Sequence, residues 1–135
     1  MFCLMLVSWQ SMATAFVVVV NKNNPIESLS KREVIDIYMG RFLTFPDGEH
    51  VQPLDLPSQS SLKNDFYVSL VNQDERKIKA YWARLLFSGR AKPPETLDSI
   101  AAILAKVEKI NQAIAYIPAT AVTDNVKVVY RLDEN

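Results

Sequence analysis

The chain has 135 residues, which is enough for one domain with its own hydrophobic core but too few for two full lobes. Its 15 lysine and arginine residues balance 15 aspartate and glutamate residues, and the two signs are interspersed, which argues against nucleic acid or an anionic membrane as a partner. One histidine and one cysteine (Cys3) leave no material for a histidine-rich metal cluster or a disulfide framework, and we expect no cofactor.

The first residues resemble an export signal. Met1–Val7 is almost wholly apolar, and Ala13-Thr14-Ala15 has the small-x-small pattern of a signal-peptidase site. This pattern predicts a signal peptide over residues 1–15, a mature domain over residues 16–135, and a periplasmic or secreted location. No Lys or Arg precedes the apolar run, so an uncleaved anchor continuing through Val20 is the competing interpretation. Polar side chains within that stretch make it a poor membrane span, and we expect no stable membrane insertion after signal removal.

The next segments predict a strand and a helix. Phe16–Asn21 is a continuous run rich in β-branched residues, which is typical of a buried central strand. A turn at Asn23-Asn24-Pro25 leads to Ser30 and Glu33, whose spacing is that of a capping box at a helix start. Gly40 is positioned to end this helix.

A loop, a strand and two helices are expected in the middle of the chain. Arg41–Glu49 is predicted to be a loop pinned by aromatic side chains, and Val51–Leu56 a short strand. A helix then begins at Ser60 or Ser61. Asn72 with Glu75 three residues later predicts the cap of the next helix, whose apolar residues follow the helical template from position 78 to position 86.

The last third predicts one more helix and two strands. Ser88–Pro94 breaks the chain, and apolar residues from Leu97 onward mark a helix that ends near Asn111. Ala113–Ile117 and Val126–Tyr130 are predicted strands. Strands that alternate with helices favour an α/β sandwich with an at least partly parallel sheet.

Catalytic patterns are missing. The chain has only three glycines and no nucleophile elbow, Walker loop or dinucleotide fingerprint. A pair between His50 and Ser60 or Ser61 is possible by sequence distance, but nothing singles it out. We therefore predict a protein that is not an enzyme.

A binding site is favoured instead. In open α/β sheets, ligands lie beyond the carboxyl ends of strands, and three segments follow predicted strands: Asn21–Ser30, Leu56–Ser61 and Pro118–Thr123. The second is rich in serine and enters a helix, where free backbone N–H groups and the helix dipole favour an oxyanion. The alternative is an ordinary serine N-cap without a ligand.

The segments that identify a family occur in order along the whole mature chain. They are Phe16–Asn21, Pro25, Leu29–Gly40, Asp47-Gly48, the helix entry Ser60–Phe66, and Ile114–Ile117. Together they resemble the phosphate-binding proteins of phosphate ABC transporters. Tyr81-Trp82, Leu86–Gly89 and Pro93-Pro94 are similar to short, single-domain secreted relatives. The resemblance implies a single three-layer α/β/α lobe of the type-2 periplasmic-binding-protein fold, with a mixed sheet of about four to five strands.

The resemblance also implies a site for inorganic phosphate or a similar oxyanion. Family members hold phosphate with a Ser-Gly-Thr turn at a helix N-terminus and a nearby arginine; here Ser60 matches the serine, Ser61 the glycine and Leu62 the threonine. The arginine position is Leu56 or lies beside Asp55, whose carboxylate either accepts a proton-bearing phosphate oxygen or repels the dianion. The predicted ligand set is, in full, Asp55, Ser58, Ser60, Ser61 and Lys63.

A lone lobe is expected to bind weakly. The helix dipole contributes about 0.3–1 kcal/mol and a charge-assisted hydrogen bond about 1.5–3 kcal/mol, so a few such contributions give only millimolar affinity. Phosphate-binding proteins close two lobes around the anion, so a homodimer or another protein partner is expected to complete the site. The alternative function is a lobe that has lost its ligand and serves as a protein-interaction or assembly module.

Overall fold

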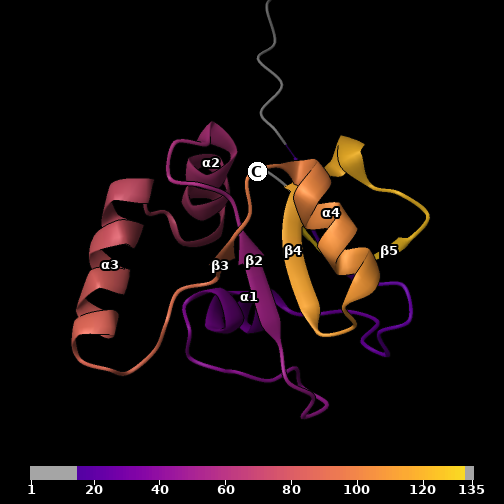
Figure 1. The fold of residues 1–135 in the computed structure, drawn as a ribbon, viewed down its shortest axis with the longest axis horizontal. Helices are drawn as coiled ribbons and strands as arrows, with labels where there is room; N and C mark the ends of the chain where they lie inside the picture. Colours follow the sequence, from indigo (N-terminus) through magenta and orange to yellow (C-terminus); the bar gives the residue numbers. More distant parts are fainter. Residues whose placement is uncertain (1–14, 133–135) are drawn as a thin grey trace, which may run out of the picture.

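The computed structural model describes residues 15–132 and has five strands, four α-helices and one 3₁₀ turn in that range (Figure 1). The signal-peptide prediction and Cys3 fall almost entirely outside the described residues. In chain order the elements are β1 (Phe16–Asn21), α1 (Lys31–Tyr38), β2 (Gln52–Asp55), α2 (Ser61–Val71), α3 (Glu75–Phe87), β3 (Glu95–Thr96), α4 (Ile100–Lys109), β4 (Ala113–Pro118), η1 (Ala119–Ala121) and β5 (Val126–Leu132).

The strands form one mixed sheet in the order β3-β2-β4-β1-β5. β2 is parallel to β3 and to β4, whereas β1 is antiparallel to both of its neighbours, β4 and β5. The segments Leu56–Ser61 and Pro118–Thr123 therefore leave the sheet at one edge, which we call the carboxyl edge. Asn21–Ser30 leaves it at the opposite edge, because β1 runs the other way. Of the three segments predicted to follow strands, only two can contribute to a common site.

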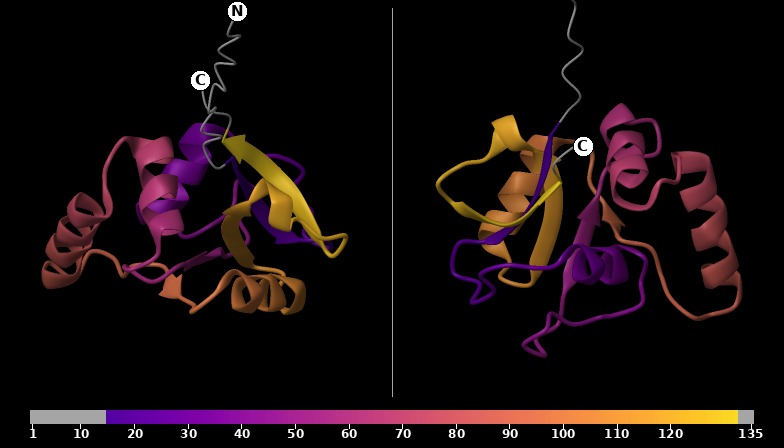
Figure 2. Two further views of the ribbon diagram at one scale, coloured as in Figure 1. Left: turned by 90° about the horizontal axis from the view of Figure 1, so that it is seen from above. Right: turned by 180° about the vertical axis from the view of Figure 1, so that it is seen from behind.

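Helices cover both faces of the sheet, which confirms the predicted α/β/α layers. α4 packs on one face, against β1, β4 and β5, while α1 and α2 lie on the other (Figure 2). All six residues of β1 are buried, in agreement with its uninterrupted apolar sequence. Under α1 and α2, five aromatic rings pack edge-to-face or stacked: Phe16, Tyr38, Phe66, Tyr67 and Tyr116. α3 packs beyond α2, at one end of the molecule.

Helix boundaries follow most of the sequence signals. The capping box of α1 is formed, since Ser30 accepts from the Glu33 amide and the Glu33 carboxylate accepts from the Ser30 amide. Gly40 follows α1 with a φ of 74°, and a Cβ there would lie 2.7 Å from Cη2 of Trp82. Both conditions require glycine at this position.

Two predicted boundaries are wrong. Asn72 does not cap α3; it ends α2 in a left-handed conformation, with a φ of 56°, and Asp74 caps α3 by accepting from the Lys77 amide. Leu97 does not belong to α4, because its amide donates to the carbonyl oxygen of Asp55 at 2.9 Å, just after the two-residue strand β3. Polar residues suited to caps occur in clusters at both places, so sequence alone did not select the right one.

Candidate anion site at the carboxyl edge of the sheet

The serine-rich turn between β2 and α2 is closed by its own backbone. β2 ends at Asp55, the Leu56 side chain is buried, and the Ser60 amide donates to the Pro57 carbonyl oxygen at 2.9 Å. Ser60 has the extended backbone of an N-cap, and α2 begins at Ser61. Of the two serines predicted to begin this helix, Ser60 is therefore the N-cap residue and Ser61 the first helical residue.

The first turn of α2 differs from that of the other α-helices. Ser30, Asp74 and Ser99 each accept a hydrogen bond from a first-turn amide of α1, α3 and α4. Ser60 makes no such side-chain bond. Within residues 15–132, the first amides of α2 therefore have no capping side chain, and these donors are the ones that bind anions at helix N-termini.

The uncapped turn opens onto a cavity of about 450 Å³. Its lining residues come from the β2–α2 turn and from the start of α4: Leu56, Pro57, Gln59, Ser60, Leu62, Asp98, Ser99 and Ile100. Two helix N-termini, those of α2 and α4, thus border the same cavity. Of these two termini, both within residues 15–132, only that of α2 lacks a capping side chain, because Ser99 accepts from the Ala102 amide at 3.1 Å.

The cavity offers neutral donors rather than positive charge. No lysine or arginine is among its lining residues in the described part of the chain, and Asp98 brings one exposed carboxylate. The available donors are backbone N–H groups of α2, the Ser60 hydroxyl and the Gln59 amide. This set suits a small oxyanion with protons of its own better than a fully ionised one, because Asp98 repels negative charge.

Ser60 is the one predicted ligand that lines the cavity. Ser58 and Ser61 are exposed beside it and are not part of its lining. The Lys63 ammonium lies 3.4 Å from a carboxylate oxygen of Glu75, and both side chains are largely buried, so this cation holds α2 to α3. The structure therefore does not gather the five predicted ligands around one point.

Asp55 lies beneath the turn and faces the core. Asp55 is only 3% exposed, and its Oδ2 accepts a hydrogen bond from the Tyr67 hydroxyl at 2.7 Å. Oδ1 accepts from the Tyr116 hydroxyl and from the Leu56 amide. Both carboxylate oxygens are thus occupied inside the protein, and the carboxylate ties β2 to α2 and β4.

Three buried tyrosines surround Asp55 in this network. The Tyr38 hydroxyl donates to the carbonyl oxygens of Leu54 and Ile114, next to the Asp55 contacts. Burial raises the pKa of Tyr38, Tyr67 and Tyr116 well above the ordinary tyrosine value, and the negative charge of Asp55 raises it further. The hydroxyls therefore stay protonated, as donors to a buried carboxylate must be.

Sequence reasoning missed Gln59, Asp98 and Ser99. Ser99 stands directly before the periodic apolar residues of α4 and was readable as an N-cap. Its position beside the β2–α2 turn was not readable, since it depends on β3 pairing with β2. Within residues 15–132 there is no cluster of three or more potential metal-ligating side chains, and no helix is long and apolar enough to cross a membrane.

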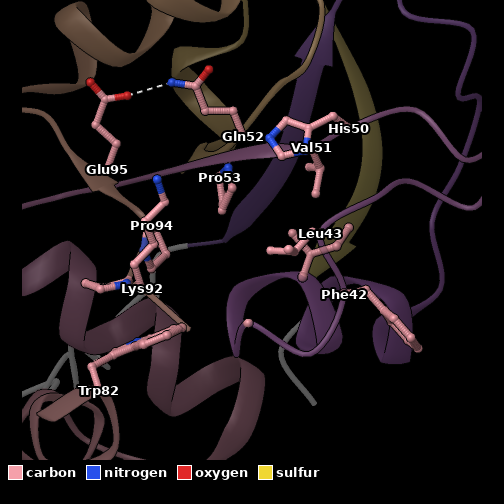
Figure 3. A pocket seen from close by; sticks show the side chains of 13 residues that line it. Phe42, Leu43, His50, Val51, Gln52, Pro53, Trp82, Lys92, Pro94 and Glu95 are labelled. Carbon is pink, nitrogen blue, oxygen red and sulfur yellow. Dashed lines mark hydrogen bonds between the residues drawn. The ribbon is translucent and has the colours of Figure 1, made fainter. Parts of the chain in front are cut away.

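A larger groove of about 520 Å³ lies at the opposite edge of the sheet (Figure 3). Its walls are mainly apolar, with Trp82 of α3 on one side and Phe42 and Leu43 on the other. Phe45, from the same loop, is buried and pins the loop to the core as predicted, whereas Phe42 and Leu43 are 59% and 65% exposed. None of the predicted ligands lies in this groove.

Comparison with solved structures identifies the architecture. An ABC-type phosphate transport receptor from Vibrio cholerae matches with a TM-score of 0.67 at 16% identity, over 87% of this chain and 47% of the receptor. A phosphate ABC transporter substrate-binding protein from Clostridium perfringens, solved with bound phosphate, matches with a TM-score of 0.67 at 18% identity, over 87% and 45%. This chain has the fold of half a phosphate-binding protein.

The phosphate-binding-protein fold recurs in a third structure, a phosphate-binding protein from Planctomyces limnophilus, with a TM-score of 0.61 at 14% identity. That match covers 87% of this chain but only 42% of the other protein. No protein-family model and no curated protein matches the sequence. The matches to solved structures confirm the predicted fold class.

Proposed function

We propose that this chain is an exported, non-enzymatic module that binds phosphate or a similar oxyanion at the N-terminus of α2. The observation that carries the proposal is the uncapped first turn of α2, which opens onto the cavity at the carboxyl edge. The fold it shares with half of several phosphate-binding proteins supports the same choice of ligand. The export signal predicted from the sequence of residues 1–15 supports a periplasmic or secreted location.

The chemistry of the cavity sets the strength of binding. A volume of about 450 Å³ exceeds that of one tetrahedral oxyanion, so water remains around the ligand and weakens each hydrogen bond. Without a lysine or arginine in the lining, the dipole contributes about 0.3–1 kcal/mol and each hydrogen bond to the anion about 1.5–3 kcal/mol. We therefore expect a millimolar dissociation constant for the lone chain, and tighter binding when a second protein surface closes the cavity.

Titration of the purified chain with phosphate, sulfate and arsenate tests this proposal. Calorimetry and thermal unfolding of the wild type are compared with Ser60→Ala, which removes the hydroxyl at the cavity. Ser30→Ala is the matched control, because Ser30 is the N-cap of α1, which follows β1 at the opposite edge. We expect the wild type and Ser30→Ala to respond at millimolar phosphate, and Ser60→Ala to respond several-fold more weakly. No heat and no thermal shift in the wild type would contradict the proposal.

A second candidate function is a protein-interaction module, favoured by the groove at the opposite edge. Exposed Phe42 and Leu43 flank an apolar groove large enough for a side chain of another protein. Because this groove and the anion cavity lie at opposite edges of the sheet, one partner in the groove does not close the cavity. Sedimentation of the wild type against a Phe42→Ser, Leu43→Ser variant tests whether the groove mediates self-association.

A further inference from the structure

Positive charge is concentrated in one segment of this neutral chain. Residues 76–94 contain six of the 15 lysines and arginines and none of the 15 acidic residues. The six cations are Arg76, Lys77, Lys79, Arg84, Arg90 and Lys92. All six are exposed, and none forms an ion pair or a side-chain hydrogen bond with another residue in the part of the chain that the structure describes.

The segment projects from the molecule because α3 has one inward face only. Ile78 and Trp82 are its buried residues, and the Tyr81 hydroxyl donates to the Met39 carbonyl oxygen at 2.6 Å. The rest of the helix faces solvent at the end of the molecule beyond α2 (Figure 2). Partners therefore reach its outer face without displacing any element of the fold.

The outer face of α3 carries an apolar ridge between the cations. Ala80, Ala83 and Phe87 follow the i, i+3, i+7 spacing that places residues on one side of a helix, and all three are exposed. Phe87 is 96% exposed, the highest value among the large hydrophobic residues of the described chain, and neighbouring Leu86 is 53% exposed. An apolar strip flanked by basic residues is the composition of helices that lie in a membrane interface.

A hollow at the C-terminal end of α3 suits an anionic headgroup. It measures about 280 Å³ and is lined by Tyr81, Arg84, Leu85, Ser88 and Arg90. Arg84 and Arg90, from either side of the Ser88-Gly89 turn, thus line one small space. Arginine recognises phosphate oxygens through paired N–H donors.

We propose that the outer face of α3 and residues 88–92 form a docking surface for an anionic lipid bilayer. The six unpaired cations supply the attraction to lipid phosphate, and Phe87 with Leu86 enters the boundary between headgroups and acyl chains. A nucleic acid or an acidic protein fits less well, because the exposed apolar side chains between the cations offer no hydrogen bonds to a polar partner, whereas a bilayer buries them. The proposal is independent of the anion site, since α3 contributes no residue to that cavity.

Vesicle co-flotation of the full chain tests the proposal. Vesicles of phosphatidylcholine alone give the baseline, which includes any contribution of the apolar residues 1–15, and vesicles with phosphatidylglycerol give the charge-dependent increment. We expect a clear increment that disappears at high salt. The Arg76→Gln, Arg84→Gln, Arg90→Gln variant is expected to lose on the order of a hundredfold in this binding, at about fivefold per cation.

Two variants make the outcome specific. Lys22→Gln, Arg32→Gln, Lys109→Gln has the same net charge as the triple α3 variant, but its substitutions are exposed and lie away from α3; we expect wild-type binding. Phe87→Ala keeps every cation and is expected to reduce binding several-fold. Circular dichroism verifies that each variant is folded. Equal binding of both triple variants, or no increment with phosphatidylglycerol, overturns the proposal, as does stronger binding to an oligonucleotide or an acidic peptide than to vesicles.

Discussion

Asp55 has a structural role, because its buried carboxylate accepts hydrogen bonds from tyrosines of the core and is shielded from solvent. The resemblance to phosphate-binding proteins implies an arginine position beside Asp55 and predicts that position 55 faces an anion. Its carboxylate instead accepts from Tyr67 and Tyr116 in the core. Sequence alone did not reveal this role, because Tyr67 and Tyr116 lie on different elements and meet Asp55 only after folding.

These buried tyrosines make stability sensitive to alkaline pH. Their folded-state pKa lies above the unfolded value of about 10, so their protons stay bound in the folded chain while the unfolded chain loses its own. The free energy of unfolding is therefore retained below about pH 10 and falls above it, by about 1.4 kcal/mol per pH unit for each tyrosine. Urea titrations of the wild type and Tyr67→Phe between pH 8 and 11 measure this slope, which we expect to be shallower in the variant. Equal slopes would mean that Tyr67 ionises in the folded protein.

At the scale of elements, the sequence predicted what depends on local pattern. The buried run of β1, the capping box of α1 and the start of α2 were all readable because their signals lie within a few residues. The direction of β1 and the existence of β3 were not, since strand pairing depends on distant partners. The prediction that acids and bases are interspersed is wrong for residues 76–94, which contain six cations and no acid. The equal numbers of acidic and basic residues in the whole chain do not reveal that this segment has no acidic residue.

The N-terminus of α2 allows a prediction that separates capping from ligand binding. Ser60→Asp places a carboxylate where it accepts from first-turn amides, so we expect the free energy of unfolding to rise by about 1 kcal/mol. The same carboxylate occupies the donors proposed for the anion and repels it, so the phosphate response should vanish. Ser30→Asp is the control, because Ser30 already caps α1; its stability and phosphate response should stay near wild type. Loss of stability in Ser60→Asp would show that these amides are not free.

At the scale of the molecule, the cavity at the N-terminus of α2 is bordered by one lobe only. The solved phosphate-binding proteins that share this fold are about twice as long as the matched region, and the chain covers 47% of the Vibrio cholerae receptor. A cavity left open at the carboxyl edge keeps its ligand in contact with water, which limits affinity. If a second copy closes it, phosphate binding and self-association are linked, and each strengthens the other by the same factor.

This linkage predicts that the apparent affinity for phosphate rises with protein concentration. Sedimentation at two protein concentrations, with and without millimolar phosphate, should show more dimer when phosphate is present, because the anion binds the dimer more tightly. Ser60→Ala should weaken the phosphate dependence several-fold, whereas Phe42→Ser, Leu43→Ser should preserve it, since that groove lies at the other edge of the sheet. The opposite pattern, in which only the Phe42 and Leu43 substitutions prevent association, would assign the interface to the groove and leave the anion cavity open in the dimer.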